Sequence, residues 1–213
     1  MTVFSSYFSQ GKELITKSTD DLGSLIENES NKEEISELIY HRFYERFLKI
    51  FFYDSTNKTE YQNSGVKEVN NAFHFEYKNG FLMMSSSCLL IESIASFISG
   101  NDKTLGNGNE NYIVVFLKCE EYNNDLKIFK NQNIYKSIRN GLLHQGEIYD
   151  NYKIRRDGKL FDEQKRTINA TKFVVSLKSF LDGYRNDLND SNWDSEIWDN
   201  CRRKIRFIVK NAT

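Results

Sequence analysis

The chain has 213 residues, of which 29 are basic and 30 acidic, for a net charge of −1. This balance excludes a global positive field of the kind that attracts nucleic acids or membranes, so any polyanion site has to be local. The length suits one well-buried domain, with or without an added subdomain. A hydrophobic content of 39% predicts a packed core, and the absence of proline leaves helices free to run long.

The cysteines are odd in number and widely spaced, so they predict no disulfide framework. They suit small core positions in a protein of the reducing cytoplasm. The first residues lack a basic segment followed by a long apolar run, and we expect no secretory signal. The longest apolar stretches, within 81–98 and 112–119, are expected to be too short or too polar to span a bilayer. We therefore expect no membrane partner, and no ligand spacing indicates a metal or cofactor. The cysteines are Cys88, Cys119 and Cys201.

Residues 1–60 are expected to form an N-terminal helical extension, packed as one unit with a helical domain over 61–213. Residues 1–30 indicate a short helix or a loose arm. Ser30 with Glu33 three residues later is a capping-box pattern that predicts a helix start. Apolar residues then recur at helical spacing, at Ile35, Leu38, Ile39, Phe43, Phe47, Leu48 and Phe51.

A long helix is expected from about Val66 to a stop at Gly100. Its apolar positions are Phe73, Tyr77, Met84, Cys88, Ile91, Ala95 and Ile98. The run "YIVVFLKC" at 112–119 suits a buried strand or a short helix, and its helical neighbours favour the helix. The next helix is expected over 131–145.

Asp157–Gly158 predicts a type I′ β-hairpin between two short runs. A helix follows, with Phe173, Leu177, Leu181, Tyr184 and Leu188 at helical spacing. The last helix is expected to start near Ser191 and to bury Trp193, Ile197, Cys201, Ile205 and Ile208. The predicted fold is an all-α antiparallel helical bundle with a small β-hairpin inserted after the helix over 131–145.

The segment "YKSIRNGLLHQGEI" places a polar trio (Arg139, Asn140 and His144) beside ordinary core residues. On an ideal helix, at about 100° per residue, the trio faces away from the core stripe around Ile138. Leu143 lies on the same outward side. We therefore expect this face to meet another helix or a second subunit.

Gly141 supports the same expectation. A glycine inside a helix costs about 1 kcal/mol relative to alanine, and a close backbone approach would compensate for this cost.

The stretch "SIRNGLLHQGE" resembles the Arg-x4–6-His motif of HEPN domains, here Arg139, a polar Asn140 and His144. The order of the surrounding helices is also similar to that of bacterial HEPN proteins, and the resemblance covers roughly residues 70–210. It implies a homodimer formed through the motif helix, in which two copies of the motif make one active cleft. It further implies a metal-independent endoribonuclease that acts as a toxin or as an antiphage or stress effector, with an antitoxin or another regulator as partner.

The residue types suit this chemistry. RNA carries its own nucleophile, the 2′-OH, so the protein has to supply a proton carrier and a cation. Histidine as a residue type can accept or donate a proton at physiological pH, so His144 would move protons, while Arg139 would hold the scissile phosphate. Asn140 would orient the imidazole or a phosphate oxygen. The products would be a 2′,3′-cyclic phosphate and a 5′-hydroxyl.

Other candidates each have a structural alternative. Glu92 is expected either to meet Arg139 or His144 or to pair with another interior cation. Gln145 and Glu147 would line the cleft or form a solvated helix end. Arg155 and Arg156 would bind RNA phosphates or belong to a solvated face, as would the cations of 202–206. The two remaining histidines, His41 and His74, fit packing or surface positions.

The resemblance has one departure and one alternative. Some HEPN toxins are silenced by nucleotide transfer onto a Tyr two residues after the His, and this position is Gly146 here. Tyr149 lies farther along and does not match. The alternative function is a non-catalytic HEPN-type helical module that binds a partner protein or a nucleotide.

Overall fold

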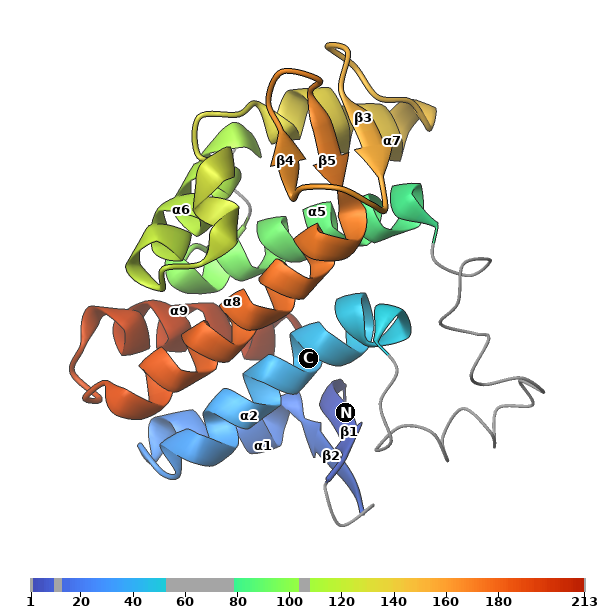
Figure 1. The fold of residues 1–213 in the computed structure, drawn as a ribbon. Helices are drawn as coiled ribbons and strands as arrows, with labels where there is room; N and C mark the ends of the chain where they lie inside the picture. The colour runs from blue at the N-terminus through green and yellow to red at the C-terminus, as the bar shows by residue number, and fades with distance from the viewer. Residues whose placement is uncertain (1, 10–12, 53–78, 104–107, 213) are drawn as a thin grey trace.

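The computed structural model describes residues 2–9, 13–52, 79–103 and 108–212. This part of the chain is mostly helical, with two small sheets (Figure 1). Helix α8 (Ala170–Asp190) crosses the middle of the molecule, and it packs against α2 (Lys32–Phe43) and α5 (Gly80–Ile98). Helix α9 (Glu196–Ala212) packs against α5, and α1 (Thr19–Glu27) packs against α9. The predicted helical class is therefore confirmed.

The N-terminus differs from the expected helix or loose arm. Strands β1 (Val3–Phe8) and β2 (Leu14–Ser18) pair antiparallel before α1 begins. Ser18 caps α1 through a capping box with Asp21, the same pattern that we assigned to Ser30 and Glu33. The expected short helix or loose arm is therefore wrong for residues 3–8 and 14–18, which form these two strands, and Phe4 on β1 is fully buried in the core.

Helix α2 begins one residue later than predicted. Its N-cap is Asn31, whose side-chain oxygen accepts a hydrogen bond from the Glu34 amide at 3.1 Å. The helix continues as a π-helix, Tyr44–Leu48, and a 3-10 turn, Lys49–Phe51. Six of the seven predicted apolar positions are buried, and Phe47 is partly buried.

Helix α5 is the central core helix. The expected positions Phe73, Tyr77 and His74, and the expected start at Val66, lie outside the described residues. Asn79 caps the helix, and Gly100 follows it with φ of 64°, which confirms the predicted stop. By length and composition α5 would be able to cross a membrane, contrary to our expectation, but 56% of the apolar window is buried inside the fold.

The run at 112–119 is helical, as favoured, and lies in α6 (Gly108–Glu121). A 3-10 turn, Asp125–Phe129, follows it. All three cysteines are buried and free, as expected. Helix α9 starts at Glu196 rather than near Ser191, which instead caps the end of α8.

The largest fully buried side chain of α9 is Trp198, which the sequence analysis did not select. Its indole Nε1–H donates to the Leu188 carbonyl at 2.8 Å, so it ties α9 to α8. The selected Trp193 is only partly buried.

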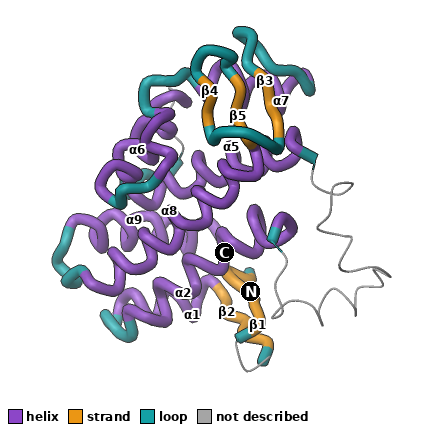
Figure 2. The backbone as a smooth tube through the Cα atoms, in the orientation of Figure 1, coloured by secondary structure: helices purple, strands orange, loops and turns teal. Residues whose placement is uncertain are grey.

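The predicted hairpin at Asp157–Gly158 is wrong, because its two flanking runs do not pair. Strand β3 (Lys153–Arg155) pairs parallel with β5 (Thr167–Asn169), and β4 (Phe161–Asp162) pairs antiparallel with β5, in the order β3-β5-β4. Strand β5 is the central strand of this three-stranded sheet, and its Ile168 is fully buried against the core. Figure 2 shows this sheet at the opposite end of the molecule from β1 and β2.

Candidate functional site

The polar trio lies on a helix with an unusual turn. The helix predicted over 131–145 consists of a π-helix, η4 (Tyr135–Asn140), followed directly by α7 (Gly141–Gln145). Residues five apart lie about 140° from each other on an α-helix, which would separate Arg139 from His144. The i→i+5 hydrogen bonding of a π-helix widens the turn, so residues five apart come closer to one side.

The structure brings the three side chains together. Arg139 Nη1 lies 3.1 Å from His144 Nε2 and donates to Asn140 Oδ1 at 3.2 Å. For Nη1–H to donate to the imidazole, Nε2 has to carry its lone pair, which assigns the ring proton to Nδ1. His144 is exposed, whereas Arg139 and Asn140 are half-buried. The cluster therefore lies at the surface, where a ligand can reach the imidazole.

Glu92 on α5 fixes the other edge of the guanidinium. Arg139 Nε donates to Glu92 Oε1 at 2.6 Å, and Nη2 donates to Oε2 at 3.1 Å, a bidentate ion pair. The side chains are only 20% and 13% exposed. The hydrogen bond to Glu92 raises the pKa of Arg139 above its ordinary value. The expectation that Glu92 meets Arg139 is confirmed as a contact.

The guanidinium is thus oriented before any ligand arrives. Its Nε–Nη2 edge is taken by Glu92, and its Nη1 group faces Asn140 and His144. The Tyr135 ring lies against it, with its centroid 5.3 Å from Cζ. Both N–H groups of Nη1 are already directed at Asn140 Oδ1 and His144 Nε2, so an incoming anion reaches Nη1 by displacing one of these acceptors.

The close backbone approach expected at Gly141 exists, but it is made by the same chain. A Cβ on Gly141 would lie 2.3 Å from the carbonyl oxygen of Glu147. The chain turns back there because Gly146 has a left-handed φ of 68° and ends the helix. The conformation of Gly146 also gives a structural reason for glycine at the position where some HEPN toxins carry a Tyr.

The remaining predicted residues do not join the cluster. Gln145 and Glu147 are exposed beyond the helix end. In the described part of the chain, no hydrogen bond links their side chains to the trio. Arg155 is exposed on β3, and Arg156 is half-buried after it. Neither arginine is part of the hydrogen-bonded cluster of Arg139, Asn140 and His144, so their role in RNA binding stays a prediction.

Two structural alternatives are supported by contacts. Arg202 and Arg206 pair with Glu29 and Glu27, respectively, as a solvated charged face would. His41 stacks on Tyr7 with ring centroids 3.6 Å apart, so it is a packing residue.

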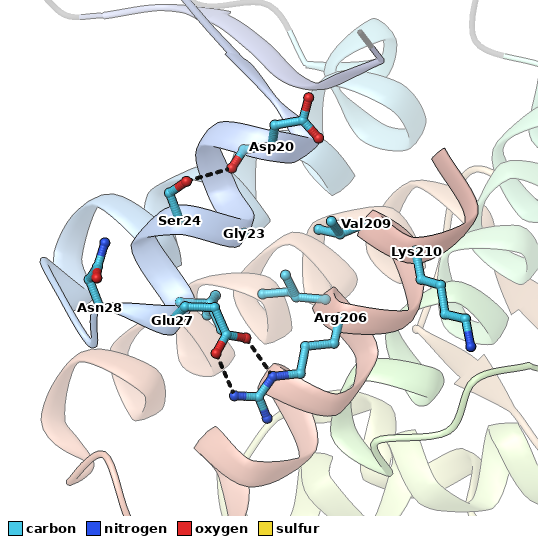
Figure 3. Close-up of a pocket in the computed structure, with 10 residues that line it drawn as sticks. Asp20, Gly23, Ser24, Glu27, Asn28, Arg206, Val209 and Lys210 are labelled. Atoms are coloured by element: carbon cyan, nitrogen blue, oxygen red, sulfur yellow. Dashed lines mark hydrogen bonds and ion pairs between the residues drawn. The ribbon is translucent and has the colours of Figure 1, made fainter. Parts of the chain in front are cut away.

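One pocket lies between α1 and α9, away from the trio (Figure 3). Its wall is largely apolar, and the Glu27–Arg206 ion pair, at 2.7 Å, spans its edge. Within the described ranges, no group of three or more His, Cys, Asp or Glu residues could hold a metal ion.

A second pocket, of about 490 Å³, shares Glu92 with the candidate site. Four cations line it, and the sequence analysis missed them as a group because they come from α2, from its π-helical continuation, from the segment after α5 and from α9. They are Arg42, Arg46, Lys103 and Lys204. The one local signal is the i, i+4 spacing of the two arginines, which places them on one helix face.

A comparison of the chain with protein families, with curated proteins and with solved structures finds no match.

Proposed function

We propose that the protein is a metal-independent endoribonuclease of the HEPN type, with Arg139, Asn140 and His144 as its catalytic residues. The observation that carries the proposal is the 3.1 Å contact between Arg139 Nη1 and an exposed His144 imidazole. A fixed cation and a proton carrier side by side are what cleavage by an internal 2′-OH requires.

The reaction follows from these groups. When the phosphate takes over the Nη1–H that points at His144 Nε2, the lone pair on Nε2 becomes free to take the proton of the 2′-OH. The 2′-oxygen attacks the adjacent phosphorus, and the bond to the 5′-oxygen breaks after a second proton donor protonates that oxygen. The products are a 2′,3′-cyclic phosphate and a 5′-hydroxyl. Arg139 Nη1 stabilises the charge that develops on the phosphorane oxygens.

A homodimer supplies the second proton carrier. One imidazole cannot at the same moment accept the 2′-OH proton and protonate the leaving oxygen, so a partner copy of His144 would take the second role. Apolar side chains support such an interface: Leu82 and Leu89 are exposed at i, i+7 on α5, and Glu92 lies one turn after Leu89. A patch of this kind beside the site is typical of an interaction surface.

A second candidate function, a non-catalytic HEPN-type binding module, is favoured by one observation. Glu92 already neutralises Arg139 in a bidentate ion pair, as in a purely structural contact. The biological role as a toxin or antiphage effector, restrained by an antitoxin or another regulator in the cytoplasm, belongs to the first candidate and comes from the resemblance alone.

Cleavage in EDTA separates the two functions. The purified protein is incubated with structured and unstructured RNA, and with the same RNA carrying 2′-deoxy positions. We expect cleavage of RNA only, and a loss of at least about a hundredfold in His144→Ala. The matched control is His41→Gln, because His41 is a packing residue, and its activity should stay within about twofold of wild type at equal foldedness. Equal cleavage by wild type and His144→Ala would indicate a contaminant and refute the proposal.

The dimer has its own test. Leu82→Glu is expected to convert a dimer into a monomer in light scattering and to reduce cleavage in the same proportion. A wild-type protein that is monomeric at micromolar concentration would contradict the composite site.

A further inference from the structure

We infer that the pocket between α2, α5 and α9 is a phosphate-binding subsite, which holds a phosphate group of the RNA strand flanking the one cleaved at Arg139 and His144. The cations that form it, the basic pocket residues Arg42, Arg46, Lys103 and Lys204, are not part of the Arg-x4–6-His motif. The inference rests on the proposed function for its ligand, and it deepens that function by assigning where the substrate extends.

The basic pocket is positively charged. Its four cations face two carboxylates, Glu92 and Asp102, and Glu92 is already bound to Arg139. Among the described residues, no ion pair joins Arg42 or Arg46 to a carboxylate. Both instead donate to a neutral acceptor, the Phe4 carbonyl, at 2.8 Å and 3.1 Å. A guanidinium has five N–H donors, so these bonds leave donors facing the pocket.

The positive charges of the pocket also repel one another, and a bound anion would reduce this repulsion. Burial and the neighbouring Arg46 lower the pKa of Arg42 to about 10. Burial lowers the pKa of Lys204 too, and the charge of Arg42 lowers it further against the opposing effect of Asp102. Partly buried charges without counter-charges are costly. A bound phosphate would compensate two or more of them at once.

The pocket is placed where a neighbouring phosphate would be. Glu92 on α5 is one of the residues that line the pocket, and its carboxylate also binds Arg139. The pocket therefore lies directly beside the proposed catalytic cluster. Leu89 and Ser93, which lie within one turn of Glu92, line the pocket as well. A strand whose scissile phosphate contacts Arg139 Nη1 would therefore extend along α5 into the basic pocket.

The recessed position favours RNA over an acidic protein surface. Lys103 and Arg46 are exposed at the rim, but Arg42 is half-buried against β1 and Lys204 is half-buried on α9. A small phosphate group on a flexible strand reaches such donors more easily than a carboxylate on a folded surface does. Arginine is also the residue that matches phosphate oxygens best.

The test measures binding without cleavage. His144→Ala protein is titrated with a single-stranded RNA that is 2′-O-methylated throughout, at several salt concentrations. Arg46→Gln and Lys204→Gln are each expected to weaken binding about tenfold. Each should also reduce the slope of log K against log salt by about 0.7, the contribution of one phosphate contact on a single strand. Lys204→Arg should keep both quantities, because it keeps the charge.

The matched control is Lys165→Gln, since Lys165 is an exposed cation in the turn between β4 and β5 and lies outside this pocket. Equal melting temperatures of the variants establish that binding, not folding, is compared. Unchanged affinity and slope in both pocket variants, or the same loss in Lys165→Gln, would overturn the subsite. If the His144→Ala protein, with its pocket residues unchanged, does not bind this RNA, the subsite is refuted as well. Salt-dependent binding with no cleavage by the wild type would refute the nuclease and leave the subsite standing.

Discussion

Replacing Glu92 by Gln is expected to destabilise the protein by about 2 kcal/mol. The carboxylate accepts two charge-assisted hydrogen bonds from Arg139, at 2.6 Å and 3.1 Å. A Gln keeps one acceptor oxygen but turns an amide donor toward the other guanidinium nitrogen. One charge-assisted bond of about 1.5–3 kcal/mol is then lost, at the lower end because both side chains are partly exposed. For a chain of this size the melting temperature should fall by about 4–8 °C.

A double-mutant cycle isolates the pair from other effects. Arg139→Gln alone should cost a similar amount, because it leaves Glu92 half-buried without its partner. The double variant should lose less than the sum, with a coupling energy of about 1–3 kcal/mol. The four proteins are compared by urea denaturation at one temperature and one salt concentration.

An exposed ion pair provides the reference. Lys130 and Glu120 lie 2.6 Å apart, with side chains 37% and 43% exposed. A cycle on this pair should give a coupling of about 0.2–1 kcal/mol. If the coupling of Glu92 with Arg139 is no larger, the ion pair does not fix the guanidinium, and our account of how Arg139 is oriented is refuted.

Gly141→Ala is expected to cost about 1–3 kcal/mol in urea denaturation, because its Cβ would lie 2.3 Å from a backbone oxygen. Gly23→Ala, whose Cβ would lie 3.4 Å from a Val209 methyl, should instead raise the free energy of unfolding by up to about 1 kcal/mol. A Gly141→Ala variant more stable than wild type would contradict the clash at Gly141. Burial raises the pKa of each cysteine thiol to about 12 and also keeps an alkylating reagent away from the sulfur. Native alkylation at pH 9 should therefore be much slower than alkylation in urea, and full native labelling by mass spectrometry would refute this. The same shift should reduce stability above pH 9, where the unfolded thiols ionise first.

The sequence predicted the helices with long apolar periodicity and the residues that meet at the candidate site. In α8, all five predicted apolar positions are buried, since period and burial agree over many turns. The link between Glu92 and Arg139 was one of two alternatives that the sequence left open, because a carboxylate inside an apolar helix needs a partner but the sequence does not say which cation. In both cases, local pattern and tertiary packing impose the same requirement.

Short elements escaped prediction where tertiary contacts decide. Strands of two or three residues such as β3 and β4 carry too few positions for a period, and the turn residues Asp157 and Gly158 suggested a direct pairing. Instead β5 lies between them, because Ile168 brings it onto the core. The basic pocket escaped for a related reason, since its cations come from segments far apart in the chain.

The π-helix is the feature on which the proposed chemistry depends most. The wheel of an ideal helix put Arg139 well away from His144, yet Nη1 lies 3.1 Å from Nε2, with Arg139 in the π-helix and His144 in α7. A π-helical turn is less favourable than an α-helical one, so packing has to hold it. The buried Ile138 holds one side, and the Glu147 backbone returning over Gly141 holds the other. A substitution that restores regular α-helix between Tyr135 and Gly141 should therefore abolish the proposed cleavage while leaving Arg139, Asn140 and His144 in the chain.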